Sequence, residues 1–320
     1  MALLALPLPS VPTQRFEFEE PHMGTLVRLV LYAPDQATAS SAARAAFDRV
    51  AELDAALSDY RDSSEVSLLA RAAGGPPVAV GPDLFAVLEC AQDVARRSGG
   101  AFDVTVGPLV RLWRRTLRTG DWPDPEQRAE ALLNVGIGKV HLDRVARTVR
   151  LDRAGMRIDL GGIAKGYAGD QALRVLRGQQ VSSALVAVGG DIVAGDPPPG
   201  EAGWVVAIAP DDETGPQERL LVRRAAVSTS GDREQWVEHD GERYSHILDP
   251  RTGIGLTGRR RATVVAPEGV TADSLATAAC VLGPAEAVAL VEATPGAAAI
   301  VRAGGETRAS RGWSALPRAH

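Results

Sequence analysis

The sequence predicts an α+β fold with mixed or antiparallel sheets and flanking helices. Several apolar runs of strand length are joined by short turns, and Asp240-Gly241 between 235–238 and 242–247 has the pattern of a two-residue β-hairpin. Other stretches carry apolar residues at helical spacing, such as the stripe from Leu84 to Ala95. Because the predicted strands are numerous and often linked by hairpins, an α+β arrangement is favoured over a doubly wound parallel sheet.

The first half of the chain is expected to begin with a hairpin and to continue mainly as helices. The hairpin comprises strands at 15–19 and 25–32 around a turn at 21–24. A long helix follows over 37–57, and Ser64 or Asp62 can cap a short helix that ends at Arg71. Further helices are predicted from Leu84 to the Gly99-Gly100 stop, around 109–117 and over 126–133. A second hairpin is predicted from strands at 139–142 and 148–151.

The second half is expected to alternate strands with three helices. Strands are predicted at 156–160, 184–188, 204–209, 219–223, 226–229, 262–266 and 298–302, in addition to the hairpin at 235–247. The helices are predicted at 164–177, 271–282 and 284–292. We expect a single domain over 15–305, a flexible N-terminus at 1–14 and a loose, Arg-rich tail at 306–320.

Composition excludes some classes of function. The net charge of −5 argues against nucleic acid as a main partner. Cys90 and Cys280 both lie in apolar helix-like runs, so buried free thiols are expected, although a disulfide stays open. The apolar stretch at 1–12 lacks the basic start and cleavage site of a signal peptide, and no long uncharged apolar run follows. A cytoplasmic location is therefore expected, with a membrane-associated or exported protein as the alternative.

The stretch from Asp159 to Asp170 carries the features of a phosphate site. Its glycines lie between an apolar run and a predicted helix, where free N–H groups favour an anion. Asp159 and Lys165 add a carboxylate and a cation. Gly161 and Gly166 have the spacing of a Walker loop, but Tyr167 stands where that loop requires lysine. A tight strand-to-helix turn with a solvated lysine is the alternative interpretation.

Two further segments carry groups suited to catalysis. Asp273 and Thr277 are four residues apart on a predicted helix, so their hard oxygen donors share one face and suit Mg²⁺, unless Asp273 is only a helix cap. In the run 245–253, His246 can act as a base and Arg251 can hold an anion, unless the run is only a turn with a surface histidine.

Three glycine-rich turns are weaker candidates. In the run 100–108, Phe102 beside Asp103 can cover a flat ring and bind its polar edge. The turns at 188–191 and 229–232 carry hydroxyls or carboxylates beside glycine. The other histidines have no metal-ligand spacing, so a zinc site is not expected, and no Gly-x-Ser-x-Gly elbow supports a hydrolase triad.

Taken in order, these pieces resemble the ApbE-type family, the FAD:protein FMN transferases. The similarity extends from His22-Met23-Gly24-Thr25 to Leu282-Gly283. It is carried by the segments at 57–65, 100–103, 159–170, 189–191, 229–232, 246–253 and 272–277. The lipobox cysteine of the family's lipoproteins is absent, which leaves export and anchoring open.

The resemblance implies an ApbE-type fold with FAD in a cleft and Mg²⁺ at its pyrophosphate. It implies transfer of FMN from FAD to a Thr or Ser hydroxyl of an acceptor protein, with release of AMP. The implied FAD-site residues are Met23, Tyr60, Ala101, Phe102, Asp103, Asp159, Lys165 and Ile247. The implied metal site comprises Gly162, Asp273, Ala276 and Thr277.

Two residues are expected to contribute to catalysis directly. His246 would deprotonate the acceptor hydroxyl, and Lys165 would stabilise the developing negative charge. Two alternatives use the same cleft: a module that binds or stores FAD without turnover, and a Mg²⁺-dependent FAD pyrophosphatase that yields FMN and AMP.

Overall fold

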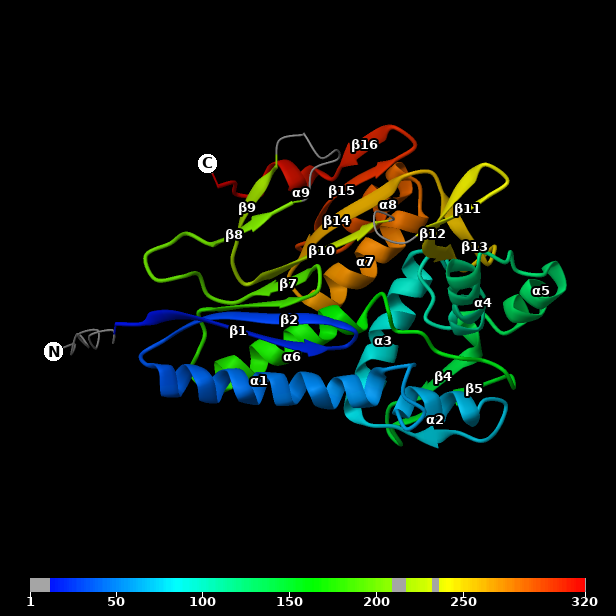
Figure 1. The fold of residues 1–320 in the computed structure, drawn as a ribbon, viewed down its shortest axis with the longest axis horizontal. Helices are drawn as coiled ribbons and strands as arrows, with labels where there is room; N and C mark the ends of the chain where they lie inside the picture. The colour runs from blue at the N-terminus through cyan, green and yellow to red at the C-terminus, as the bar shows by residue number, and fades with distance from the viewer. Residues whose placement is uncertain (1–11, 209–216, 232–235, 320) are drawn as a thin grey trace.

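One large antiparallel sheet organises the molecule, which we describe from a computed structural model (Figure 1). The structure describes residues 12–208, 217–231 and 236–319. The sheet has eight strands in the order β1-β2-β6-β7-β10-β14-β15-β16. Their bounds are Gln14–His22, Thr25–Ala33, Ala184–Val188, Asp191–Ala194, Ala225–Gly231, Arg260–Ala266, Ala298–Ala303 and Glu306–Ala309.

Alternating side chains give this sheet two apolar faces. In β2, Val27, Leu29 and Leu31 join the main core, whereas Val30 joins a second cluster on the opposite face. The helices α1 (Gln36–Leu57), α3 (Pro82–Arg97), α6 (Ala164–Gly178), α7 (Gly269–Val281) and α8 (Pro284–Glu292) contribute to the main core. The hairpin of β8 (Trp204–Ala207) and β9 (Arg219–Val222) covers the other face. The α+β class with antiparallel sheets is thereby confirmed.

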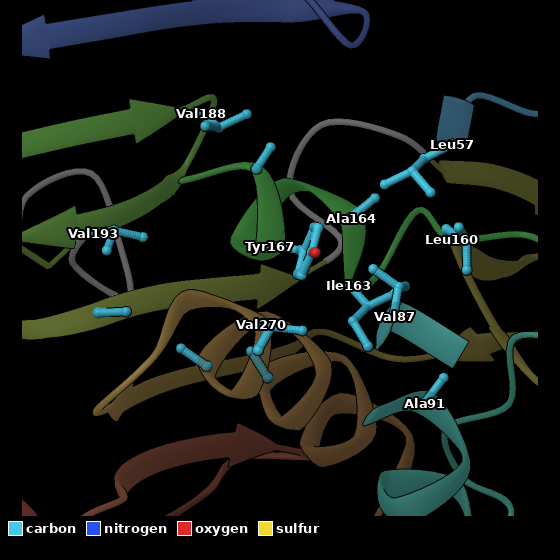
Figure 2. Close-up of a cluster of buried hydrophobic side chains, with 14 of the residues drawn as sticks. Leu57, Val87, Ala91, Leu160, Ile163, Ala164, Tyr167, Val188, Val193 and Val270 are labelled. Atoms are coloured by element: carbon cyan, nitrogen blue, oxygen red, sulfur yellow. The ribbon is translucent and has the colours of Figure 1, made fainter. Parts of the chain in front are cut away.

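Helices α6 and α7 approach each other closely at two glycines. A Cβ on Gly166 would lie 2.1 Å from the Gly269 carbonyl oxygen, and a Cβ on Gly269 would lie 2.4 Å from that of Gly166. Figure 2 shows Ile163, Ala164 and Tyr167 at the start of α6 among the core side chains of Leu57, of Val87 of α3 and of Val270 of α7. This packing brings the start of α6 against the first turns of α7.

A smaller unit packs beside the main sheet. It contains α4 (Gly107–Thr119), α5 (Pro125–Leu133) and a three-stranded sheet of β11 (Trp236–His239), β12 (Glu242–Asp249) and β13 (Ile254–Thr257). Leu109, Trp113, Ala131 and Leu248 form its core, and the Trp113 indole N–H donates to the Ser245 carbonyl oxygen at 2.8 Å. The remaining elements near it are α2 (Glu65–Arg71), η1 (Ile137–Lys139), β3 (Val78–Ala79), β4 (Val140–Asp143) and β5 (Thr148–Leu151).

Two expectations from the sequence are corrected. The run 156–160 is not a strand: its Asp159 N–H donates to the Val104 carbonyl oxygen, and a single bridge joins Arg157 to Val106, so no ladder forms. The stretch from 306 is not a loose tail. It adds β16 to the sheet and forms α9 (Arg311–Ser314), where Trp313 is buried in the second cluster. The flexible N-terminus predicted at 1–14 lies largely outside the described residues, and Gln14 already belongs to β1.

Neither cysteine forms a disulfide; Cys280 is buried, as predicted, and Cys90 is only half-buried. Within the described ranges, none of the helices is long and apolar enough to cross a membrane.

Candidate functional site

A cleft of about 1050 Å³ lies where the main sheet meets α6, α7 and the smaller unit. Its walls come from β2, β6, β7 and β10 of the sheet, from α4 and from β12. The cleft brings together most residues that the sequence nominated. These are Tyr60, Ala101, Phe102, Asp103, Asp159, Gly162, Lys165, His246, Ile247, Asp273 and Thr277.

Met23 and Ala276, both named by the family resemblance, do not line this cleft. Met23 lies in the β1–β2 turn with a φ of 53° and packs against the main core. Ala276 is fully buried in α7. Its methyl group cannot bind a cation, so its backbone carbonyl is the one oxygen it has to offer.

Lys165 lies between two buried carboxylates. Its ammonium nitrogen is 2.5 Å from Asp191 Oδ2 and 3.9 Å from Asp273 Oδ1. Burial alone would lower the pKa of Lys165, but the charges of Asp273 and Asp191 outweigh it and raise that pKa. Burial, and then the charge of Asp191, raise the pKa of Asp273. Two carboxylates thus share one ammonium in a region shielded from water, which favours a further cation.

The first turn of α6 already receives an anion from within the chain. The Gly166 N–H donates to Asp273 Oδ2 at 3.0 Å, so this carboxylate satisfies one of the donors that the sequence predicts for a phosphate. Asp273 itself lies inside α7, whose N-cap is Glu268. The alternative that Asp273 caps its own helix is therefore wrong; it caps the neighbouring one.

Oxygen donors suited to Mg²⁺ converge beside this carboxylate. A Cβ on Gly162 would lie 2.7 Å from Thr277 Oγ1, so glycine lets the 161–162 backbone come close to the Asp273/Thr277 face of α7. Thr277 Oγ1 is 3.3 Å from Ser230 Oγ. Among the described residues, no group of three or more His, Cys, Asp or Glu side chains could hold a metal. A cation here would rely on hydroxyl and carbonyl oxygens as well, a donor set that fits Mg²⁺.

The Phe102-Asp103 pair is engaged within the protein. Asp103 Oδ1 accepts from the Thr105 N–H at 2.8 Å and its hydroxyl at 2.6 Å, and Oδ2 accepts from the Ile137 N–H at 2.8 Å. Burial raises the pKa of Asp103 despite these bonds. Phe102 is buried in the main core, whereas Tyr60, which also lines the cleft, has 77% of its surface exposed. The exposed aromatic ring in the cleft is thus that of Tyr60.

β12 brings His246 to the cleft, where the side chain is exposed. Arg251 behaves differently from the expectation that it holds an anion. Its guanidinium pairs with Asp249 through two contacts of 2.8 Å, and it does not line the cleft. This pair stabilises the turn between β12 and β13.

Four charged residues that line the cleft are absent from the predicted site, and two of them, Asp191 and Arg114, pair with residues that belong to it; the other two are Arg28 and Arg261. Asp191 follows the Gly189-Gly190 turn and pairs with Lys165, a partner that the sequence pattern of the turn does not indicate. Arg114 of α4 contacts Asp59 and Asp159, and it lies in a run that predicts only an amphipathic helix. The signal in the sequence is helical spacing: Arg114 shares a helix face with Val110, Trp113 and Leu117, and all four residues line the cleft.

Comparisons with known proteins agree on one family. The model of the ApbE family matches residues 23–301. A protein from Treponema pallidum named "FAD:protein FMN transferase" is 38% identical over 87% of this chain and 82% of its own length. The structure of "Flavin Transferase ApbE from Vibrio cholerae" superposes with a TM-score of 0.87, covering 95% of this chain and all of that one at 28% identity. An ApbE protein structure from Thermotoga maritima gives a TM-score of 0.83, with 31% identity over 96% of this chain and all of that one.

Proposed function

Because this chain belongs to the ApbE family, we propose that it transfers FMN from FAD to a threonine or serine hydroxyl of an acceptor protein and releases AMP. The names of the relatives support the transfer of a flavin. The Mg²⁺ dependence, the hydroxyl acceptor and the AMP product are the finer part of the proposal. The Mg²⁺ dependence rests on the oxygen donors that line the cleft, and the hydroxyl acceptor and the AMP product rest on the resemblance to the family.

One observation carries the proposal: a single cleft holds an exposed ring, a cation, a set of hard oxygen donors and a histidine. Its volume of about 1050 Å³ is slightly above the range of roughly 300–1,000 Å³ that is typical of small-molecule sites. That room suits a dinucleotide with an acceptor side chain beside it. Lys165 and the Asp273/Thr277 face lie on one wall, and His246 comes from β12 of the smaller unit.

The residues present fit a bound Mg²⁺. The Gly162 carbonyl, the Asp273 carboxylate and the Thr277 hydroxyl would hold it, and a bound Mg²⁺ supplies Lewis-acid stabilisation of phosphate oxygens. Lys165 supplies a fixed positive charge to the same oxygens, because Asp191 holds its ammonium in place at 2.5 Å. Because Asp191 orders Lys165, the ammonium group does not have to move during the reaction.

The transfer forms one bond and breaks one bond at phosphorus. The acceptor hydroxyl oxygen attacks the phosphorus on the FMN side of the pyrophosphate, and the bond from that phosphorus to the bridging oxygen breaks. AMP leaves with the bridging oxygen, and the acceptor carries FMN through a phosphoester. His246, exposed at the cleft, accepts the hydroxyl proton as general base.

The test mixes the protein with FAD, Mg²⁺ and a candidate acceptor domain. Flavin fluorescence that stays on the acceptor band in a denaturing gel, together with free AMP, is the expected result. Free FMN and AMP without labelled acceptor would indicate the pyrophosphatase instead. Bound FAD without any product would indicate a storage module, and either outcome would contradict the proposed transfer.

A further inference from the structure

Arg114 connects three parts of the cleft wall. From α4, its Nη1 is 2.5 Å from Asp59 Oδ2 and its Nη2 is 2.9 Å from Asp159 Oδ2. Its guanidinium carbon lies 4.4 Å from the centre of the Tyr60 ring. The side chain is 35% exposed and lines the cleft. One residue thus joins the loop after α1 to the segment that precedes α6.

The carboxylate of Asp159 depends on this cation. Its side chain is only 10% exposed, and burial raises its pKa; the charge of Arg114 is the largest influence in the opposite direction. Asp59 pushes the pKa of Asp159 up again. Arg114 opposes part of the effect of burial and of the like charge, although the pKa of Asp159 stays above its ordinary value. Arg114 holds Asp159 Oδ2, the Gly161 N–H donates to Oδ1 at 2.9 Å, and together they fix where the carboxylate points.

The ring of Tyr60 depends on the same cation. Tyr60 lies in the loop between α1 and α2 and is 77% exposed, so little of the protein restrains it. A ring left free loses rotamer entropy when a ligand stacks on it, and that loss weakens binding. A guanidinium 4.4 Å above one face holds the ring by a cation–π contact and leaves the opposite face for a flat ligand ring.

These contacts require the shape of arginine as well as its charge. The guanidinium presents separate N–H groups to two carboxylates and its flat face to an aromatic ring at the same time. A lysine ammonium is a point charge that can pair with one carboxylate but cannot cover the ring.

We propose that Arg114 is a positioning residue for FAD: it orients the Asp159 carboxylate and backs one face of the Tyr60 ring, so that the other face receives a flat ring of the dinucleotide. This inference rests on the proposed function, because it takes FAD as the ligand of the cleft. Arg114 acts through Asp59, Tyr60 and Asp159 and transfers no proton.

The test measures FAD binding by fluorescence titration, and KM and kcat by acceptor labelling. Arg114→Gln should raise the Kd and the KM for FAD about tenfold, equivalent to about 1.4 kcal/mol, and should change kcat less than KM. Arg114→Lys should restore part of that loss by keeping the charge. Arg115→Gln is the matched control, because Arg115 is exposed on the same helix and does not line the cleft; it should bind FAD as the wild type does.

A double-mutant cycle shows whether Arg114 acts through Tyr60. Once Tyr60→Ala has removed the ring, Arg114→Gln should weaken binding clearly less than it does in the wild-type background. Additive effects would overturn the role assigned to the ring. If Arg114→Gln does not fold, Arg114→Lys with the same cycle decides.

Different results would overturn the proposed function and the role of Arg114. Wild-type protein that neither binds FAD nor labels the acceptor would overturn the proposed function and this inference with it. Wild-type activity together with an unchanged Kd in Arg114→Gln would overturn this inference alone. So would an equal loss of binding in Arg114→Gln and Arg115→Gln, which would point to a general effect on α4.

Discussion

At the scale of single residues, the main feature of the cleft is a group of charged side chains that are partly or fully buried. Lys165, Asp191 and Asp273 are brought together from α6, β7 and α7, and Ser228 of β10 donates a further hydrogen bond to Asp191. Removing one charge from such a group leaves the others uncompensated. Substitutions that keep the charge and change one oxygen are therefore the informative ones.

Thr277 allows such a substitution. Thr277→Val keeps the shape of the side chain and removes the hydroxyl that we assign to Mg²⁺, whereas Thr277→Ser keeps the hydroxyl. We expect Thr277→Val to raise the Mg²⁺ concentration for half-maximal acceptor labelling by about tenfold or more, as the loss of one oxygen ligand implies. Thr277→Ser should stay near the wild type. Equal Mg²⁺ requirements in all three proteins would remove Thr277 from the metal site.

The residues of this site differ in how far the sequence alone could place them. The local spacing of Asp273 and Thr277 predicts that they share one helix face, and both lie in α7 and line the cleft. The sequence does not indicate Asp191 or Arg114 as site residues, because their partners are distant in the chain. Lys165 is 26 positions from Asp191, and Asp159 and Asp59 are 45 and 55 positions from Arg114. The sequence predicts that Asp103 binds the polar edge of a ligand, yet three protein donors bind it, one of them 34 positions away.

At the scale of elements, α6 and α7 hold each other's first turns. Asp273 of α7 accepts from the Gly166 N–H of α6, and Asp170 of α6 accepts from the N–H groups of Gly269 and Val270 at 2.7 and 2.9 Å. Neither helix has a side-chain cap of its own. The reciprocal carboxylates replace local caps, and the glycine contact makes room for them. Sequence patterns indicate local caps, so they predict the Ser64 cap of α2 but not the hydrogen bonds between α6 and α7.

Asp170 gives this helix pair a pH dependence. Burial is the largest influence on it and raises its pKa from 3.8 to about 6 despite the two N–H donors. Between these values the folded protein keeps a proton that the unfolded chain has released. The free energy of unfolding therefore falls as the pH rises through this window, on the order of 2 to 3 kcal/mol for this group.

Asp170→Asn isolates that contribution, because asparagine keeps an acceptor and does not titrate. The unfolding free energy of the wild type minus that of the variant, from urea titrations, should decrease between pH 4 and pH 6 and be level above pH 7. A difference that increases with pH would mean that attraction of the carboxylate to the start of α7 outweighs its burial. In that case the assigned direction of the pKa would be wrong.

At the scale of the whole molecule, the sheet separates two apolar regions with different tasks. The main core on the helical face supports α6 and α7 and hence the charged wall of the cleft. The second cluster gathers Trp204, Val222, Ile300 and Trp313 on the other face, and none of these four lines the cleft. The fold class could be predicted because hairpins and helical stripes are local patterns. The closing strand β16 could not, since its residues are all exposed and its pairing with β15 is decided by register rather than composition.

This separation predicts that stability and ligand binding can be changed independently. Trp313 is 4% exposed, so Trp313→Ala leaves a large cavity in the second cluster and should lower the free energy of unfolding by about 3–5 kcal/mol in urea titrations. The Kd for FAD should stay within about twofold of the wild-type value under conditions where the variant is folded. Leu133→Ala removes a side chain that is 57% exposed and serves as the control, with an expected effect within about 1 kcal/mol. If Trp313→Ala instead weakened FAD binding in proportion to its loss of stability, the sheet would transmit packing changes from one face to the other, and the two regions would act as one core.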